Sequence, residues 1–272
     1  MKAIKLILIA VVVLGAIYGL LMLVGGGSHS DGDDGPDKER LFNRLQTEID
    51  DNWQDRQSWD ASLFEADIDK LQQNKRKLKS RTYNTLLDQL AGYASDLLHQ
   101  DMMAEFSRPS CDTAKIEAYY RDLDYFLRKT TGYDNDDDIQ TMQQTYRLFK
   151  DILNASSKRF GVEPNFNYEN GTWTDFNGYR NRILSERDGY QGNRYFGYIQ
   201  DAEVVTSALE QMTERMESAK TQFKNKLAQQ IISAYREHPK TEESSSMLGG
   251  VHSQFLSQFG RQNDLYQFVL NY

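Results

Sequence analysis

The residues best suited to recognition chemistry lie in one aromatic-rich segment. Residues 165–198 hold nine aromatic residues, six asparagines and five glycines. This composition is typical neither of a helix face nor of a short connection. Aromatic rings beside amide and guanidinium groups can bind a glycan or a peptide by stacking and hydrogen bonding. The candidate binding residues are Tyr168, Trp173, Tyr179, Arg180, Arg182 and Tyr190.

A structural role is the alternative interpretation of the same segment, because large rings commonly seal the end of a helical bundle. Asn170-Gly171 is typical of a type I′ turn and predicts a small β-hairpin near residues 165–176. In that hairpin Tyr168 would pair with Trp173, and Phe166 would lie on the face of Tyr168. The pattern does not decide between a sealed bundle end and a recognition surface.

No arrangement of catalytic residues is evident in the chain. The four histidines, His29, His99, His238 and His252, are scattered, and no two of them lie at the helical spacing of a metal site. The chain lacks the Glu-x-x-His, Gly-x-Ser-x-Gly and phosphate-loop motifs. Its single cysteine, Cys111, has no nearby histidine, which favours a structural thiol. We therefore predict no enzyme activity, no metal and no cofactor.

The charge balance excludes a class of partner. The chain has 40 acidic and 32 basic residues and a net charge of −8, so its surface repels polyanions and nucleic acid is not an expected partner. Four carboxylates lie together in residues 134–138, at the expected start of a helix, where they complement the positive end of the helix dipole. A recognition patch for a basic partner, or a weak cation site, is the alternative for this cluster.

An uncharged apolar run covers residues 6–24. At ~1.5 Å per helical residue it would span roughly 28 Å, which is close to the hydrocarbon thickness of a bilayer. Residues 1–24 are therefore predicted to be an uncleaved transmembrane signal anchor, and a cleaved secretory leader is the alternative. Lys2 and Lys5 precede the run, whereas the next basic residue is Lys38. The positive-inside rule then places the N-terminus in the cytoplasm and the body outside, against the reverse orientation with a cytosolic body.

The rest of the chain divides into a tether and a helical domain. Residues 25–36 are rich in Gly, Ser and Asp and predict a flexible tether. Residues 37–272 predict a helical extracytoplasmic domain, which would be periplasmic or secreted if the leader were cleaved. Prolines, which interrupt helices, separate its long segments at Pro36, Pro109, Pro164 and Pro239.

Hydrophobic periodicity predicts the helices of this domain. A first helix follows Asp37 as its N-cap, and a second runs over residues 60–106 with a bend near Ser80. Asp112 caps a third helix, which forms a helical hairpin with the next one, over residues 139–160. Residues 193–237 predict a long coiled-coil-like helix whose natural partner is the 60–106 segment. The last residues, 263–272, fit a strand or a helix, and the helical context favours a helix.

These patterns predict a mainly α protein, in which a single-pass transmembrane helix precedes an elongated helical bundle. Long helical seams, abundant exposed charge and the lack of catalytic residues favour a membrane-anchored interaction or scaffold protein that acts through protein–protein contacts. Its partners would be the membrane, through residues 6–24, and a protein. The alternative is an extracytoplasmic module that binds a glycan or a peptide through residues 166–198.

Overall fold

The computed structural model describes residues 36–158 and 161–272. These residues are mainly helical, and the strands found among them form one two-stranded antiparallel sheet. The predicted signal anchor, residues 1–24, and the predicted tether up to residue 35 lie outside the described residues. Among the helices that are described, none combines the length and the apolar character needed to span a bilayer.

Backbone contacts divide the chain into two compact units, one ending at Leu45 and the other covering Gln46–Tyr272. Helix α2, Pro36–Trp53, begins in the first unit and ends in the second. The second unit continues with α3 (Ala61–Asn74), the 3₁₀ helix η1 (Lys75–Lys77), α4 (Ser80–Phe106), α5 (Thr113–Lys129), α6 (Asp137–Ser157), β1 (Phe166–Asn167), β2 (Thr172–Trp173), α7 (Phe176–Gln191), the 3₁₀ helix η2 (Phe196–Tyr198), α8 (Glu203–Glu237), α9 (Glu242–Phe259) and α10 (Asn263–Asn271).

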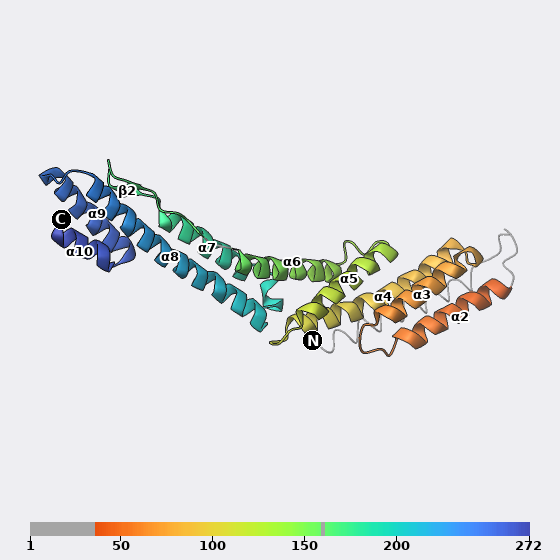
Figure 1. The fold of residues 1–272 in the computed structure, drawn as a ribbon. Helices are drawn as coiled ribbons and strands as arrows, with labels where there is room; N and C mark the ends of the chain where they lie inside the picture. Colours follow the sequence, from red (N-terminus) through yellow and green to blue (C-terminus); the bar gives the residue numbers. More distant parts are fainter. Residues whose placement is uncertain (1–35, 159–160) are drawn as a thin grey trace. The chain divides into compact units, whose positions relative to one another are not determined.

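Helix α8 is the longest described helix, and other helices of the second unit pack along it. Helices α6 and α7 lie one after the other along α8, and α9 and α10 cover its C-terminal part (Figure 1). Helix α4 packs against α3, α5 and α6. Helix α6 therefore contacts both α4 and α8, and it joins the two groups of helices within this unit.

The predicted hydrophobic seam of α8 is confirmed, but its predicted partner is wrong. The buried residues of α8 recur every three or four positions and include Val205, Leu209, Met212, Met216, Phe223, Leu227 and Ile231. They pack mainly against α6 and α7 rather than against the 60–106 segment. Helix α4 cannot be the main partner because its own apolar face is taken up by α3, α5 and α6. Sequence periodicity identifies a buried face but does not say which helix covers it.

Two of the predicted long helices are shorter than expected. The 60–106 segment breaks between α3 and α4, where the backbone of Leu78 and Lys79 is extended. This break lies at the predicted bend near Ser80, and it allows Leu78 to reach the buried core. The predicted 193–237 helix begins only at Glu203. Residues 192–202 form turns and η2 instead, because Gly192 and Gly197 disfavour a continuous helix there.

The structure also tests the predicted helix ends. Asp112 caps α5 by accepting hydrogen bonds from the N–H groups of Ala114 and Lys115, and α5 packs against α6 as predicted. Helix α10 confirms the helical interpretation of the C-terminal residues. The predicted N-cap Asp37 is wrong, since α2 begins at Pro36 and Asp37 lies in its first turn. A proline at this point is favourable because the first helical N–H has no partner within the helix.

The predicted hairpin exists, but with a different register. Phe166 pairs with Trp173, and Asn167 pairs with Thr172. The connecting loop therefore has four residues, 168–171, and Tyr168 lies in the loop instead of opposite Trp173. Gly171 has a φ of +65° and donates its N–H to the carbonyl of Asn167 at 3.0 Å.

Side-chain contacts explain the longer loop. The Tyr168 ring stacks on His238, with ring centroids 3.8 Å apart, and meets the edge of Tyr235 at 4.8 Å. These contacts hold Tyr168 against the end of α8, where it cannot also take part in the strand pairing. The side chain of Asn170 accepts a hydrogen bond from the N–H of Thr172, which closes the loop locally. The stacking of Tyr168 on His238 and Tyr235 thus outweighs the preference of Asn170-Gly171 for a two-residue turn.

A substitution at Met216 tests whether the seam of α8 is buried, because only 2% of the surface of Met216 is exposed. Met216→Asp places a carboxylate in the buried apolar face of α8. We expect the free energy of unfolding to fall by roughly 3 kcal/mol or more, measured by urea denaturation, since an ion without a partner is buried. The neighbouring exposed Glu217 supplies the control, and Glu217→Gln should change stability by less than about 0.5 kcal/mol. Equal losses for the two variants would mean that this face of α8 is not buried.

Candidate functional site

Two of the six predicted binding residues lie in the hairpin and are half-buried. Trp173 donates its indole N–H to Oε1 of Gln258 on α9 at 3.1 Å. Tyr168 rests on the C-terminal end of α8 through its contacts with Tyr235 and His238. Both rings therefore make their strongest contacts inside the protein, as rings that seal a bundle end do.

The other four predicted residues lie along α7. Tyr179 is buried, its hydroxyl has no described hydrogen-bond partner, and burial raises its pKa against the opposing effect of Arg182. The guanidinium of Arg182 lies 5.5 Å from the Tyr179 ring centroid, and Arg180 follows Tyr179 directly on the helix. Tyr190 donates to Glu186 at 3.0 Å, and burial together with this bond raises its pKa.

The structure does not bring these six residues together in one place. Tyr179 and Tyr190 are eleven positions apart on α7, which corresponds to about 16 Å along a helix. The hairpin rings face α8 and α9 instead. The exposed large aromatic side chain of this segment, Tyr198, lies further along the chain, in the turn that follows α7.

The turn at residues 192–202 is short, well anchored and partly apolar at its surface. Ile199 is fully buried beneath it. The N–H of Tyr195 donates to Oδ1 of Asn193, and the N–H of Tyr198 donates to the carbonyl of Tyr195. Tyr198 keeps 45% of its surface exposed, which makes it one of three exposed large hydrophobic side chains among the described residues. An open cavity lies on each of two sides of this turn.

The first cavity, here called the tyrosine cavity, has a volume of about 380 Å³. The turn contributes Arg194 and two tyrosines, and α6 contributes three polar residues. The guanidinium of Arg194 lies 4.6 Å from the ring centroid of Tyr195 and also donates to its hydroxyl. The lining residues are Asp137, Gln140, Thr141, Arg194, Tyr195 and Tyr198.

The second cavity, here called the phenylalanine cavity, has a volume of about 430 Å³. Phe196 and Leu209 form its apolar part, and six polar residues from α7, the turn and α8 surround them. Arg187 is fixed by hydrogen bonds to Asp188 and to the hydroxyl of Thr213. The lining residues are Arg187, Gln191, Phe196, Gln200, Thr206, Leu209, Glu210 and Thr213.

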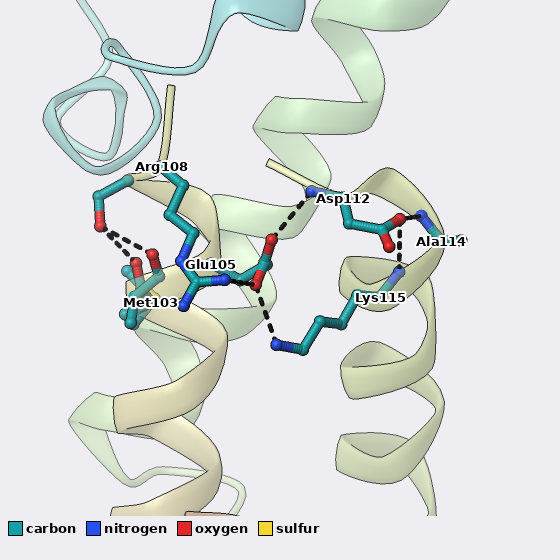
Figure 2. A network of polar contacts seen from close by, with 8 residues as sticks. Met103, Glu105, Arg108, Asp112, Ala114 and Lys115 are labelled. Carbon is teal, nitrogen blue, oxygen red and sulfur yellow. Dashed lines mark hydrogen bonds and ion pairs between the residues drawn. The ribbon is translucent and has the colours of Figure 1, made fainter. Parts of the chain in front are cut away.

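The turn is bonded to the loop between α4 and α5, and a buried carboxylate holds that loop in place. The N–H of Glu203 donates to the carbonyl of Pro109 at 2.8 Å, so the end of the turn is bonded to the loop between α4 and α5. Glu105, at the end of α4, is only 2% exposed and organises that loop. It accepts hydrogen bonds from Arg108 at 3.0 Å, from the N–H of Asp112 at 2.9 Å and from Lys115 at 3.1 Å (Figure 2).

The partners of Glu105 keep its carboxylate charged despite burial. Burial by itself would raise the pKa of Glu105. The bonds from the Asp112 N–H and from Lys115, together with the charges of Lys115 and Arg108, outweigh that effect and hold the pKa of Glu105 below its ordinary value. The carboxylate is therefore ionised at neutral pH and joins α4, the loop and α5.

Cys111 lies next to this network and is half-buried. Burial and the negative charge of Glu105 raise the pKa of its thiol, so the thiolate that a nucleophile needs is disfavoured. The predicted structural role of Cys111 agrees with this environment. Over residues 36–158 and 161–272, no group of three His, Cys, Asp or Glu side chains is arranged to hold a metal ion.

The aromatic segment contributes residues to both cavities, but none of the six predicted binding residues lines either cavity. Arg194, Tyr195 and Tyr198 lie inside the aromatic segment, and the flanking Gly192 and Gly197 are the signal that could have identified a turn there. No signal in the sequence could have joined them to the lining residues of α6, which lie more than 50 positions earlier in the chain.

Comparison with known proteins does not identify a relative. No family model matches the chain, and no curated protein or solved structure matches it.

Glu105→Gln tests the buried network. We expect the free energy of unfolding at pH 7 to fall by about 2–3 kcal/mol, because two cations lose a buried charged acceptor. Since the folded protein lowers the pKa of Glu105, this stabilisation is complete above the ordinary pKa of glutamate and is lost as the pH falls through the folded value. The denaturation curves of the wild type and the variant should therefore differ at pH 7 and converge as the pH falls through the folded pKa of Glu105.

Glu163→Gln is the matched control, because Glu163 is paired with Lys226 at the surface. An exposed pair contributes little, so this variant should stay within about 0.5 kcal/mol of the wild type. A Glu105→Gln variant as stable as Glu163→Gln would show that the network does not stabilise the fold.

Proposed function

We propose that this chain is a membrane-anchored helical interaction protein whose body binds a protein partner at the phenylalanine cavity. Residues 6–24 would provide the anchor, and the body would lie outside the cytoplasm. The observation that supports the partner site best is an apolar centre, Phe196 and Leu209, surrounded by a polar rim. Protein interfaces typically combine such an apolar centre with a polar rim.

The rim defines the chemistry of the partner. Glu210 is exposed and has no cationic partner among the described residues. The net charge of the chain, −8, also favours a partner with basic groups. We therefore expect a protein segment that inserts one apolar side chain beside a lysine or arginine. Arg187 is already bonded to Asp188 and Thr213, so its guanidinium is held in place at the side of the cavity.

The partner site can be tested by reversing the charge of Glu210. Affinity-purified full-length protein, solubilised with its co-purified partner, should retain less of that partner when Glu210→Lys is introduced. Because the basic group of the partner would then face a lysine of like charge, we expect the affinity to fall about fivefold or more. The affinity is measured by titrating the purified partner. Glu237→Lys is the control, since Glu237 is also exposed on α8 but lies about 40 Å further along the helix.

A partner that binds both variants equally well would contradict the proposed site. Attachment through the phenylalanine cavity also predicts a direct contact. A photo-crosslinking residue at Gln200, which lines the cavity, should react with the partner, whereas the same residue at the exposed Gln229 should not.

The membrane topology has its own test. Cys111→Ser gives a chain without cysteine, into which Ser28→Cys is introduced. If the body lies outside the cytoplasm, a membrane-impermeant maleimide should label the introduced thiol in intact cells or spheroplasts. Labelling only after permeabilisation would show the reverse orientation, and a mature N-terminus near Ser28 in the wild type would show that the leader is cleaved.

A further inference from the structure

We propose that the tyrosine cavity is a binding site for a neutral saccharide. This inference does not rest on the proposed protein partner, because the two cavities share no lining residue. Its basis is the combination of ring faces and hydrogen-bonding groups in a cavity of about 380 Å³. Sites for small ligands have volumes in this range and combine aromatic walls with a few polar groups.

The polar lining is balanced in charge and in hydrogen-bonding capacity. Asp137 supplies acceptors, Arg194 supplies donors, and Gln140 and Thr141 supply both. Asp137 and Arg194 form no ion pair with each other or with another described residue. Both groups are therefore available to a ligand that can donate to one and accept from the other, as neighbouring hydroxyl groups of a sugar do.

The aromatic lining provides a platform for the apolar face of a sugar ring. Tyr195 is already covered on one side by the guanidinium of Arg194. Tyr198 is 45% exposed and has no ring partner or cation over it among the described residues. An exposed ring with polarised C–H groups stacked on its negative face gains both burial and electrostatic attraction. Tyr198 is thus the stacking residue of this site, and Arg194 and Tyr195 form its wall.

Charged ligands fit this lining less well. An anionic ligand at Arg194 would meet Asp137, together with Asp136 and Asp138 beside it at the start of α6. A cationic ligand at Asp137 would meet Arg194. A neutral polyol pairs with both groups at once and leaves neither without a partner, which is the condition for low desolvation cost.

The lining residues of this cavity come from two segments that are each anchored to the fold. Three of its residues lie on α6, where Asp136 caps the helix by accepting hydrogen bonds from two backbone N–H groups. The turn that carries the other three is anchored by the buried Ile199 and by the bond between Glu203 and Pro109. Fixed groups lose little conformational freedom on binding, which favours recognition of a small polar molecule.

Saturation-transfer difference NMR with the full-length protein tests the inference, in a detergent whose headgroup contains no sugar. The probes are four neutral disaccharides: maltose, cellobiose, lactose and N,N′-diacetylchitobiose. We expect saturation transfer to the ring C–H protons of at least one of them. Tyr198→Ala should weaken that binding about tenfold or more, Gln140→Ala severalfold, and Tyr198→Phe should retain most of it because the ring remains.

Leu270→Ala is the control, because Leu270 is an exposed apolar residue on α10 and does not line the cavity. This variant should bind as the wild type does. The inference is overturned if none of the four sugars receives saturation from the wild type, or if Tyr198→Ala binds as well as Leu270→Ala. Binding of a peptide in the tyrosine cavity without any sugar binding would likewise reject the saccharide in favour of a protein ligand. Loss of the protein partner in Glu210→Lys with sugar binding intact would separate the two proposals.

Discussion

The buried, ionised carboxylate of Glu105 constrains the junction of α4 and α5, and the loop at this junction also bonds to the start of α8. A carboxylate that is 2% exposed is unfavourable unless its oxygens are bonded, and here Arg108 and the N–H of Asp112 in the loop and Lys115 on α5 supply those bonds. The carboxylate therefore defines how the chain turns from α4 into α5. Through the carbonyl of Pro109, the same loop also holds the start of α8.

Helix α6 connects the α4–α5 junction to the rest of the unit. It packs on both α4 and α8, and the α4–α5 loop bonds to the start of α8, so these two contacts connect α8 to the helices that precede α6. The turn before α8 lies where these contacts meet. An exposed tyrosine in such a turn is held in place by its surroundings, and a rigid aromatic group is well suited to recognition.

The two cavities beside this turn differ in chemistry although they share its backbone. One presents tyrosines with a carboxylate, a guanidinium, an amide and a hydroxyl, and the other presents an apolar centre with a polar rim. Neighbouring residues of the turn face different sides, so Tyr195 and Phe196 line different cavities. The two proposed ligands, a protein segment and a neutral saccharide, would therefore contact opposite sides of one short segment.

The sequence by itself determined the helical class, the buried face of α8, the cap at Asp112 and the presence of a hairpin, because periodicity, capping and turn chemistry act over a few residues. The segment that forms the cavities was also recognisable from its aromatic residues. Only the tertiary structure decided that α6 covers α8, that Tyr168 leaves the strand pairing to stack on His238, and that Gln140 lines the same cavity as Tyr198. Each of these outcomes depends on contacts between residues that are far apart in the chain. A local sequence pattern does not contain the relative energies of such contacts.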